Sequence, residues 1–192
     1  MRFIACLTVT CLVLLTSLQA GSTTVLKVPL EDMTRRSDLV IRATVEAVQV
    51  PFDPRDARPI STDVTLRIVS VLKGHASAPV LRINLPGGVG KDTYLAIPGV
   101  PTFHVGEEVL LFLERTSRGW IPSGLSEGTF RLRADTSGVL RAQRSTANVA
   151  RLVRDSTGRL IHLEGPDPED SMALPALLDA VRRGLLRQGG AR

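Results

Sequence analysis

The fold of this chain is decided by the stretch Ser37-Asp38-Leu39-Val40-Ile41-Arg42-Ala43-Thr44-Val45-Glu46-Ala47-Val48. Apolar residues take every second position from Leu39 to Ala47, and most positions between them are polar. A period of two residues is typical of a β-strand with one buried face. The residues expected on that face are Leu39, Ile41, Ala43, Val45 and Ala47.

Other parts of the sequence also have the pattern of strands. A second alternating stretch, 63–73, places Val64, Leu66 and Ile68 on its core side. Its alternation shifts at 69–71, which predicts a β-bulge, and Lys73-Gly74 ends it. Residues 109–113 are all apolar, as in a strand buried on both faces. Shorter strands are expected at 80–85, 93–97, 120–125, 129–133, 139–143, 151–154 and 159–163, the last two joined as a hairpin at 156–158.

Two helices are expected beside these strands, and no internal repeat is evident. Pro29 opens the first helix and two arginines close it at Arg36. The second helix runs from a cap at Asp170 or Ser171 to about residue 186. Its apolar stripe consists of Leu174, Leu177, Leu178, Val181 and Leu185. We expect the stripe to pack on the strands, because amphipathic helices usually bury this face in their own domain; the alternative is a partner-binding helix on a tether.

The first 20 residues have the pattern of a cleaved signal peptide. Arg2 precedes an apolar stretch at 3–18, and Ala20 is the small residue that a signal peptidase requires. The stretch is shorter than the ~20 residues of a membrane-spanning helix, although an uncleaved anchor is the alternative. Cleavage predicts a secreted or periplasmic chain, and it removes both cysteines, Cys6 and Cys11. The expected domains are the signal peptide 1–20, a β-barrel at 21–135 and a C-terminal extension at 136–192.

The charge pattern does not indicate a nucleic-acid partner. The chain has 24 Lys and Arg against 19 Asp and Glu, and the two signs are interspersed. Only 4% of residues are aromatic, whereas a base-stacking surface needs several aromatic side chains on one face. We therefore expect neither nucleic-acid binding nor a transmembrane anchor in the processed chain.

Two motifs resemble catalytic or phosphate-binding sequences but lack the required context. Gly124-Leu125-Ser126-Glu127-Gly128 matches the Gly-x-Ser-x-Gly of hydrolases, in which the serine lies between a strand and a helix. Here both flanks are strand-like, so a turn is expected and Ser126 is not assigned as a nucleophile. The loop 86–91 lacks the first glycine and the hydroxyl residue of a phosphate-binding loop.

Metal-binding patterns are also absent from the sequence. The three histidines, His75, His104 and His162, are scattered. Glu107 and Glu108 are adjacent and would point to opposite faces of a strand. Asp167, Glu169 and Asp170 lack calcium-loop spacing, so they are expected to form a solvated linker. We assign no catalytic, cofactor-binding or metal-binding residue.

Three phrases occur in an order that resembles the netrin-like module, whose best-known members are the tissue inhibitors of metalloproteinases. They are Ser37-Asp38-Leu39-Val40, the Lys73-Gly74 pair that closes a strand, and Val105-Gly106-Glu107 before the next long strand. The match covers about residues 25 to 130. The Lys-Gly pair and the phrase Gly-Glu-Glu-Val-Leu-Leu-Phe-Leu also resemble a group of exported bacterial proteins. The resemblance implies a mainly β fold with a five-stranded Greek-key barrel of the oligonucleotide/oligosaccharide-binding (OB) type, to which this chain adds the N-terminal helix, a C-terminal hairpin and the amphipathic helix.

The resemblance also implies a non-enzymatic module that binds through its N-terminus and rim loops. The expected partner is another exported protein, such as a metalloprotease that the chain inhibits. In the inhibitors an N-terminal Cys-x-Cys chelates the protease zinc, whereas this chain would begin Gly21-Ser22-Thr23. The residues expected at the contact are Gly21, Ser22, Thr23, Phe52, Arg55, Arg58, Lys91 and Tyr94. The alternative is a structural envelope protein or a carbohydrate-binding barrel with Tyr94 and Trp120 as stacking residues, and the third hypothesis is a hydrolase that uses Ser126.

Overall fold

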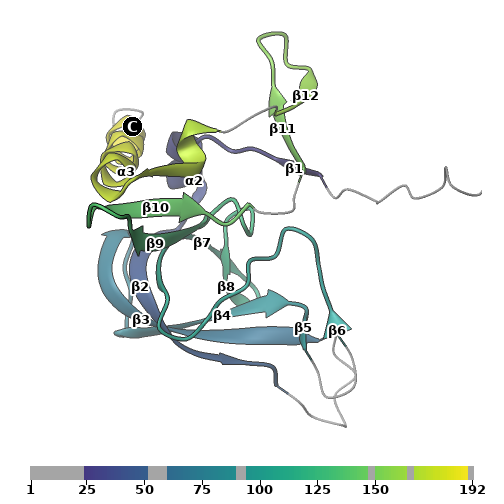
Figure 1. The fold of residues 1–192 in the computed structure, drawn as a ribbon, viewed down its shortest axis with the longest axis vertical. Helices are drawn as coiled ribbons and strands as arrows, with labels where there is room; N and C mark the ends of the chain where they lie inside the picture. Colours follow the sequence, from purple (N-terminus) through teal and green to yellow (C-terminus); the bar gives the residue numbers. More distant parts are fainter. Residues whose placement is uncertain (1–23, 52–59, 90–93, 147–149, 164–166, 190–192) are drawn as a thin grey trace, which may run out of the picture.

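The computed structural model describes residues 24–51, 60–89, 94–146, 150–163 and 167–189 (Figure 1). The chain is mainly β. Its strands are β1 (Thr24–Leu26), β2 (Leu39–Gln49), β3 (Ser61–Lys73), β4 (Val80–Pro86), β5 (Gly88–Val89), β6 (Tyr94–Leu95), β7 (Glu108–Thr116), β8 (Gly119–Pro122), β9 (Thr129–Ala134), β10 (Leu140–Arg144), β11 (Ala150–Arg154), β12 (Leu160–His162) and β13 (Ser171–Ala173). The helices are α2 (Leu30–Arg36), the 3-10 turn η1 (Pro168–Asp170) and α3 (Leu174–Gly189). A strand is present in each region where one was expected, whereas the sequence did not predict β1, β5 and β13.

Most strands form one large sheet in the order β13-β10-β9-β7-β2-β3-β4-β8, and β8 also pairs with β7. The expected barrel is not closed. At the would-be seam, β4 meets β8 at a single residue pair, Ile83 and Trp120. The reason is the length of β8, which ends at Pro122 after four residues, because proline has no N–H to continue a ladder.

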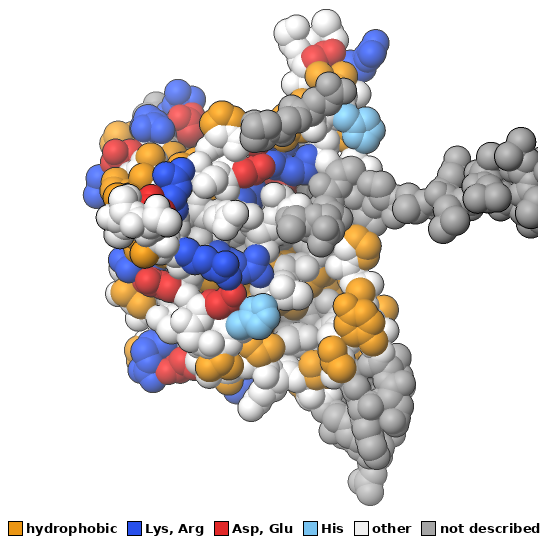
Figure 2. Space-filling model, in the orientation of Figure 1, with side chains coloured by type: hydrophobic (Ala, Val, Ile, Leu, Met, Phe, Trp, Pro, Cys, Tyr) orange, Lys and Arg blue, Asp and Glu red, His pale blue; other side chains and the backbone are white. Residues whose placement is uncertain are grey.

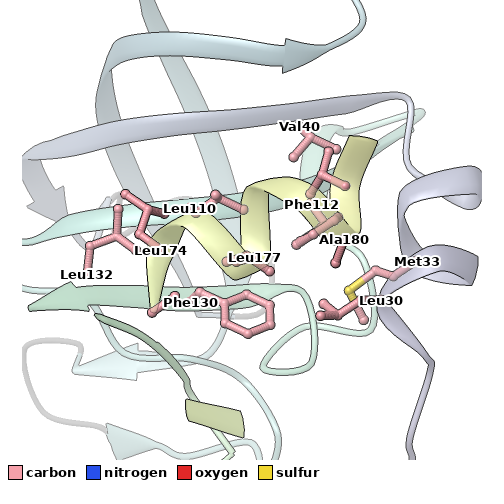
Figure 3. Close-up of a cluster of buried hydrophobic side chains, with 12 residues drawn as sticks. Leu30, Met33, Val40, Leu110, Phe112, Phe130, Leu132, Leu174, Leu177 and Ala180 are labelled. Carbon is pink, nitrogen blue, oxygen red and sulfur yellow. The ribbon is translucent and has the colours of Figure 1, made fainter. Parts of the chain in front are cut away.

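The large sheet has a hydrophobic core on each face. One core lies among β2, β3, β4 and β7 and consists of Leu39, Ile41, Ala43, Val45, Val64, Leu66, Ile83, Leu85, Phe103, Val109, Leu111 and Leu113. The other lies under α2 and α3, and Figure 3 shows Leu174, Leu177 and Ala180 of α3 facing the sheet. Residues 109–113 are therefore fully buried, as expected. Val40, which alternation placed on the polar face of β2, is also fully buried because the helices cover that face.

The helix α3 packs on the sheet through its apolar stripe and crosses α2 at close range. Leu174, Leu177 and Val181 are buried. A Cβ atom at Gly184 would lie 2.8 Å from the Cβ of Thr34, so the crossing requires a glycine. The expected cap at Asp170 or Ser171 is wrong, since residues 171–173 form β13 and the helix begins at Leu174.

The Lys-Gly pair has a structural role at the end of β3. The Lys73 ammonium donates to the backbone carbonyls of Thr34 (2.7 Å) and Arg35 (3.0 Å), and so satisfies the carboxyl end of α2. Gly74 has φ +80°, and a Cβ atom there would lie 2.3 Å from the Asp38 carbonyl oxygen. The pair therefore lets β3 end directly against the start of β2.

The bulge and the turn before β7 complete the framework. Pairing of β2 with β3 shifts register between Arg42 and Ala43, so Val69 is the extra residue, as expected. At the Val-Gly-Glu turn, Gly106 donates to the Val45 carbonyl (2.9 Å) and Val45 donates to the Glu107 carbonyl (2.9 Å). These bonds extend the β2–β7 pairing around the turn.

Candidate functional site

A hairpin formed by β5 and β6 at the rim of the large sheet carries a group of exposed apolar side chains. Val89 in β5 pairs with Tyr94 in β6, and their exposed fractions are 68% and 71%. Leu95 beside them is 38% exposed. Figure 2 shows hydrophobic side chains gathered at the lower right of the molecule, in the region of β5 and β6. We call Val89, Tyr94 and Leu95 the rim patch.

Two glycines hold the rim patch in place. A Cβ atom at Gly87 would lie 2.6 Å from the Leu95 carbonyl oxygen, and one at Gly88 would lie 2.5 Å from the Thr62 hydroxyl oxygen. Thr62 in turn donates to the Gly87 carbonyl at 2.7 Å. The hairpin is therefore packed closely against β3 at its base, while its paired apolar side chains point into solvent.

Of the eight residues expected at the contact, the structure describes Tyr94 alone. Tyr94 is highly exposed, as a contact residue must be. The other seven lie outside the described residues, and their role stays a prediction: Gly21, Ser22, Thr23, Phe52, Arg55, Arg58 and Lys91.

Trp120 does not form an open stacking surface with Tyr94. Its ring is partly buried against the core among β2, β3, β4 and β7. The Arg115 guanidinium lies 5.2 Å from the ring centroid, which is cation–π geometry. Tyr94 is thus the single residue of this pair that presents its ring to solvent.

The Gly-x-Ser-x-Gly motif forms a turn between two strands, as expected. It joins β8 to β9, and Leu125 adopts φ +57°. Ser126 is 2% exposed, and its backbone N–H donates to the Gly99 carbonyl at 3.0 Å. None of the described histidines contacts Ser126; His104, for example, is exposed and contacts Glu107 at 3.1 Å. Among the described residues, the Ser126 hydroxyl therefore has no hydrogen-bonded base, and its burial keeps it from contact with a substrate.

A buried cluster of charged side chains lies between the large sheet and the small sheet β1-β11-β12. Glu127 is 1% exposed and contacts two arginines. Its Oε2 lies 2.9 Å from Arg144 Nη1, and its Oε1 lies 2.8 Å from Arg151 Nε. Asp170 Oδ2 lies 2.5 Å from Arg151 Nη1, and Asp170 Oδ1 lies 3.2 Å from Arg144 Nε. We call Lys27, Glu127, Arg144, Arg151, Asp167, Glu169 and Asp170 the ionic cluster.

The outer part of the ionic cluster holds β1. Lys27, directly after β1, lies 2.5 Å from Asp167 Oδ2 and 3.3 Å from Glu169 Oε2. Arg151 Nη2 reaches the same Asp167 oxygen at 3.4 Å. These contacts overturn the expectation that residues 167–170 form a solvated linker. No local signal could have shown this, because the partners lie at residues 27, 127, 144 and 151 and meet only through the topology.

The pKa shifts fit a structural role for the ionic cluster. Burial lowers the pKa of Arg144, although Glu127 opposes the shift, and arginine remains protonated at neutral pH. Burial would raise the pKa of Asp167, but the hydrogen bond with Lys27 and the Glu169 N–H outweigh it and hold this pKa below its usual value. Arg144 also lies 4.8 Å from the Phe130 ring centroid. The carboxylates are thus neutralised by cations and clamp the two sheets together.

Three wider observations bear on function. Within the described residues, no group of three or more His, Cys, Asp or Glu side chains is placed to hold a metal ion. Among the helices that the structure describes, none is long and apolar enough to cross a membrane. Comparison of the chain with protein-family models, known proteins and solved structures gave no match.

Proposed function

We propose that this chain is an exported, non-enzymatic binding module whose partner is another protein. The proposal includes the OB-like Greek-key architecture implied by the netrin-like resemblance. In support, β2 pairs with β3 and β7, β3 pairs with β4, and β7 pairs with β8. Export rests on the signal-like pattern of residues 1–20.

The rim patch is the observation that carries the binding role. Val89 and Tyr94 are a cross-strand pair, and such pairs usually stabilise a sheet by burial against neighbours. Here both side chains are more than two-thirds exposed, so their burial would stabilise a complex instead of the free chain. Tyrosine combines a large apolar ring with a polar hydroxyl and is enriched among the residues that dominate protein interfaces.

An exported metalloprotease is the partner class that the resemblance favours. The rim patch lies within the expected contact loop 86–101, the second expected loop is 51–61, and cleavage after Ala20 would free the amine of Gly21. That amine could ligate the protease zinc, while the rim patch contributes the apolar contact. Processing is checked by determining the N-terminus of the exported chain.

The test uses the rim patch and a matched apolar control. The processed chain, Tyr94→Ala and Val69→Ala are immobilised and exposed to purified exported metalloproteases and to the extracellular proteins of the producing cell. Val69 is 53% exposed on β3, so its truncation removes exposed apolar surface outside the rim patch. We expect one partner to be retained by the unchanged chain and Val69→Ala but lost with Tyr94→Ala. Equal retention by all three chains would refute the role of the rim patch.

The exposed ring of Tyr94 also favours a second candidate, a carbohydrate-binding barrel. Aromatic faces stack on sugar rings, and OB-fold barrels bind oligosaccharides. A glycan array separates the candidates, because Tyr94→Phe retains the stacking face and Tyr94→Ala removes it. Glycan binding that is retained by Tyr94→Phe and lost with Tyr94→Ala would identify a carbohydrate as the ligand in place of a protein. An array with no binding would leave the protein partner as the proposal.

A further inference from the structure

The small sheet β1-β11-β12 extends from the body of the molecule and exposes apolar side chains (Figure 1). The exposed fractions of Leu26, Leu160 and Ile161 are 43%, 45% and 39%. None of the three belongs to either hydrophobic core. The ionic cluster links this sheet to the body through Lys27 and Arg151. A sheet of this size usually needs a buried apolar face to be stable.

The outer edge of β12 has unused hydrogen-bonding groups. Asp155 donates to the Arg159 carbonyl and Leu163 donates to the Arg151 carbonyl, both at 2.9 Å. Bonded pairs alternate along an antiparallel ladder, so Ile161 exchanges its bonds with Val153 of β11. The N–H and C=O groups of Leu160 and His162 therefore point away from β11. No described residue bonds to them, and Figure 1 shows no other labelled element on that side of the hairpin.

The hairpin β9-β10 shows what this edge can accept. Its turn, Asp135 to Val139, matches the β11-β12 turn, Asp155 to Arg159, because each aspartate carboxylate accepts from the backbone N–H groups two and four residues later. Leu140 pairs with Ala134 as Leu160 pairs with Arg154, so the two hairpins share one register. In the first hairpin, β10 uses its outer edge to pair with β13. The corresponding edge of β12 has no such strand among the described residues.

We propose that this edge pairs with β12 of a second copy of the chain. The two strands run antiparallel about a two-fold axis that passes between the two Ile161 residues, perpendicular to the sheet. Leu160 of each copy then lies opposite His162 of the other, and each pair exchanges two backbone hydrogen bonds. The three-stranded sheets join into one sheet in the order β1-β11-β12-β12-β11-β1.

The side chains of β12 suit this self-pairing. Val153 and Ile161 are cross-strand partners on one face, so the seam would join them into an apolar row of four side chains. On the other face Leu160 meets His162, and no charged residue faces a like charge. Natural edge strands usually avoid such pairing by carrying a charge, a proline or a bulge, and Leu160-Ile161-His162 has none of these. The edge is self-complementary, which favours a second copy over an unrelated strand.

The first test removes one donor without disturbing the monomer. Leu160→Pro deletes an N–H that points outward, whereas the hydrogen bonds between β11 and β12 do not use it. Sedimentation equilibrium at about 10 to 500 μM covers the range of a small interface. We expect the unchanged chain to dimerise and Leu160→Pro to dimerise at least roughly 10-fold more weakly. At a concentration where both chains are monomeric, the two should have the same melting temperature. A monomer throughout, or a dimer insensitive to Leu160→Pro, would overturn the proposal.

The second test reads the register directly and does not depend on the proline variant. Opposed residues of a non-hydrogen-bonded pair have Cα atoms about 4.5 Å apart, within the disulfide range. In the processed chain, which begins at Gly21 and contains neither Cys6 nor Cys11, Ile161→Cys is expected to form a disulfide-linked dimer on mild oxidation. Val69→Cys, exposed on β3, serves as the control and should remain monomeric. Equal cross-linking of the two variants would reject the register, and Tyr94→Ala should dimerise normally, since the rim patch is a separate surface.

Discussion

Replacing Glu127 with glutamine tests whether the ionic cluster clamps the two sheets. The substitution keeps the size of the side chain and removes its charge. The arginines it leaves are buried, since the side chains of Arg144 and Arg151 are 0% and 6% exposed. Loss of one partner from a buried ion pair costs about 3 to 5 kcal/mol. Asp170 still contacts both arginines, so we expect a loss of about 2 to 3 kcal/mol in the free energy of unfolding.

The assay is urea unfolding followed by Trp120 fluorescence and far-ultraviolet circular dichroism. The matched control is Glu46→Gln, which removes a carboxylate from a surface pair with Arg67, whose side chain is 61% exposed. Exposed pairs contribute below about 1 kcal/mol, so this control should unfold almost as the unchanged chain does. If Glu127→Gln and Glu46→Gln lowered the free energy of unfolding equally, the ionic cluster would not hold the two sheets together. Hydrogen exchange should also rise first in β1, β11 and β12 of Glu127→Gln, because the cluster holds that sheet.

Three further predictions concern glycine positions and acid stability. Gly74→Ala should destabilise the chain by more than about 2 kcal/mol in urea unfolding, because φ is +80° and the new Cβ would lie 2.3 Å from the Asp38 carbonyl oxygen; an unchanged midpoint would contradict this. Gly184→Ala should cost about 1 to 3 kcal/mol by pushing α3 from α2, and Thr34→Ser in the same chain should recover part of the loss by removing the Cγ2 atom at 3.0 Å. Asp167→Asn should reduce the dependence of the free energy of unfolding on pH at acid pH. The pKa of Asp167 is lowered by folding, so its contribution is present above its unfolded value of about 3.9 and is lost as pH falls through the folded value; equal acid dependence of both chains would exclude Asp167 as a source.

The strands could be predicted from the sequence because their signal is local. The alternation from Leu39 to Ala47 predicts a strand with one buried face, and the apolar run at 109–113 predicts a strand buried on both faces. The shift in alternation at Val69 predicts the β-bulge. Val40 shows the limit of this reasoning. Its position suggested an exposed face, and only the packing of α2 and α3 on that face buries it.

Contacts between distant segments could not be predicted in the same way. The short strands β1 and β13 have three residues each, too few to show a period, and they exist because β11 and β10 offer an edge. The ionic cluster is a similar case. The sequence at 167–170 predicts a polar linker, and only the structure shows that Arg144 and Arg151 contact its carboxylates. Exposure of Tyr94 was expected, whereas its pairing with Val89 depends on two glycines whose neighbours lie elsewhere in the chain.

The two matching hairpins separate what the local sequence determines from what the surroundings determine. Asp135 and Asp155 direct the same turn, and Gly138 and Gly158 take nearly the same φ, +81° and +84°. In the sequence the similarity is limited to six residues, 135–140 and 155–160, which is too short to indicate an internal repeat. In the first hairpin Leu132 lies in the core under α3, whereas the equivalent Leu152 belongs to neither core. The same local pattern thus yields a core strand pair where a sheet and helix surround it, and an open edge where they do not.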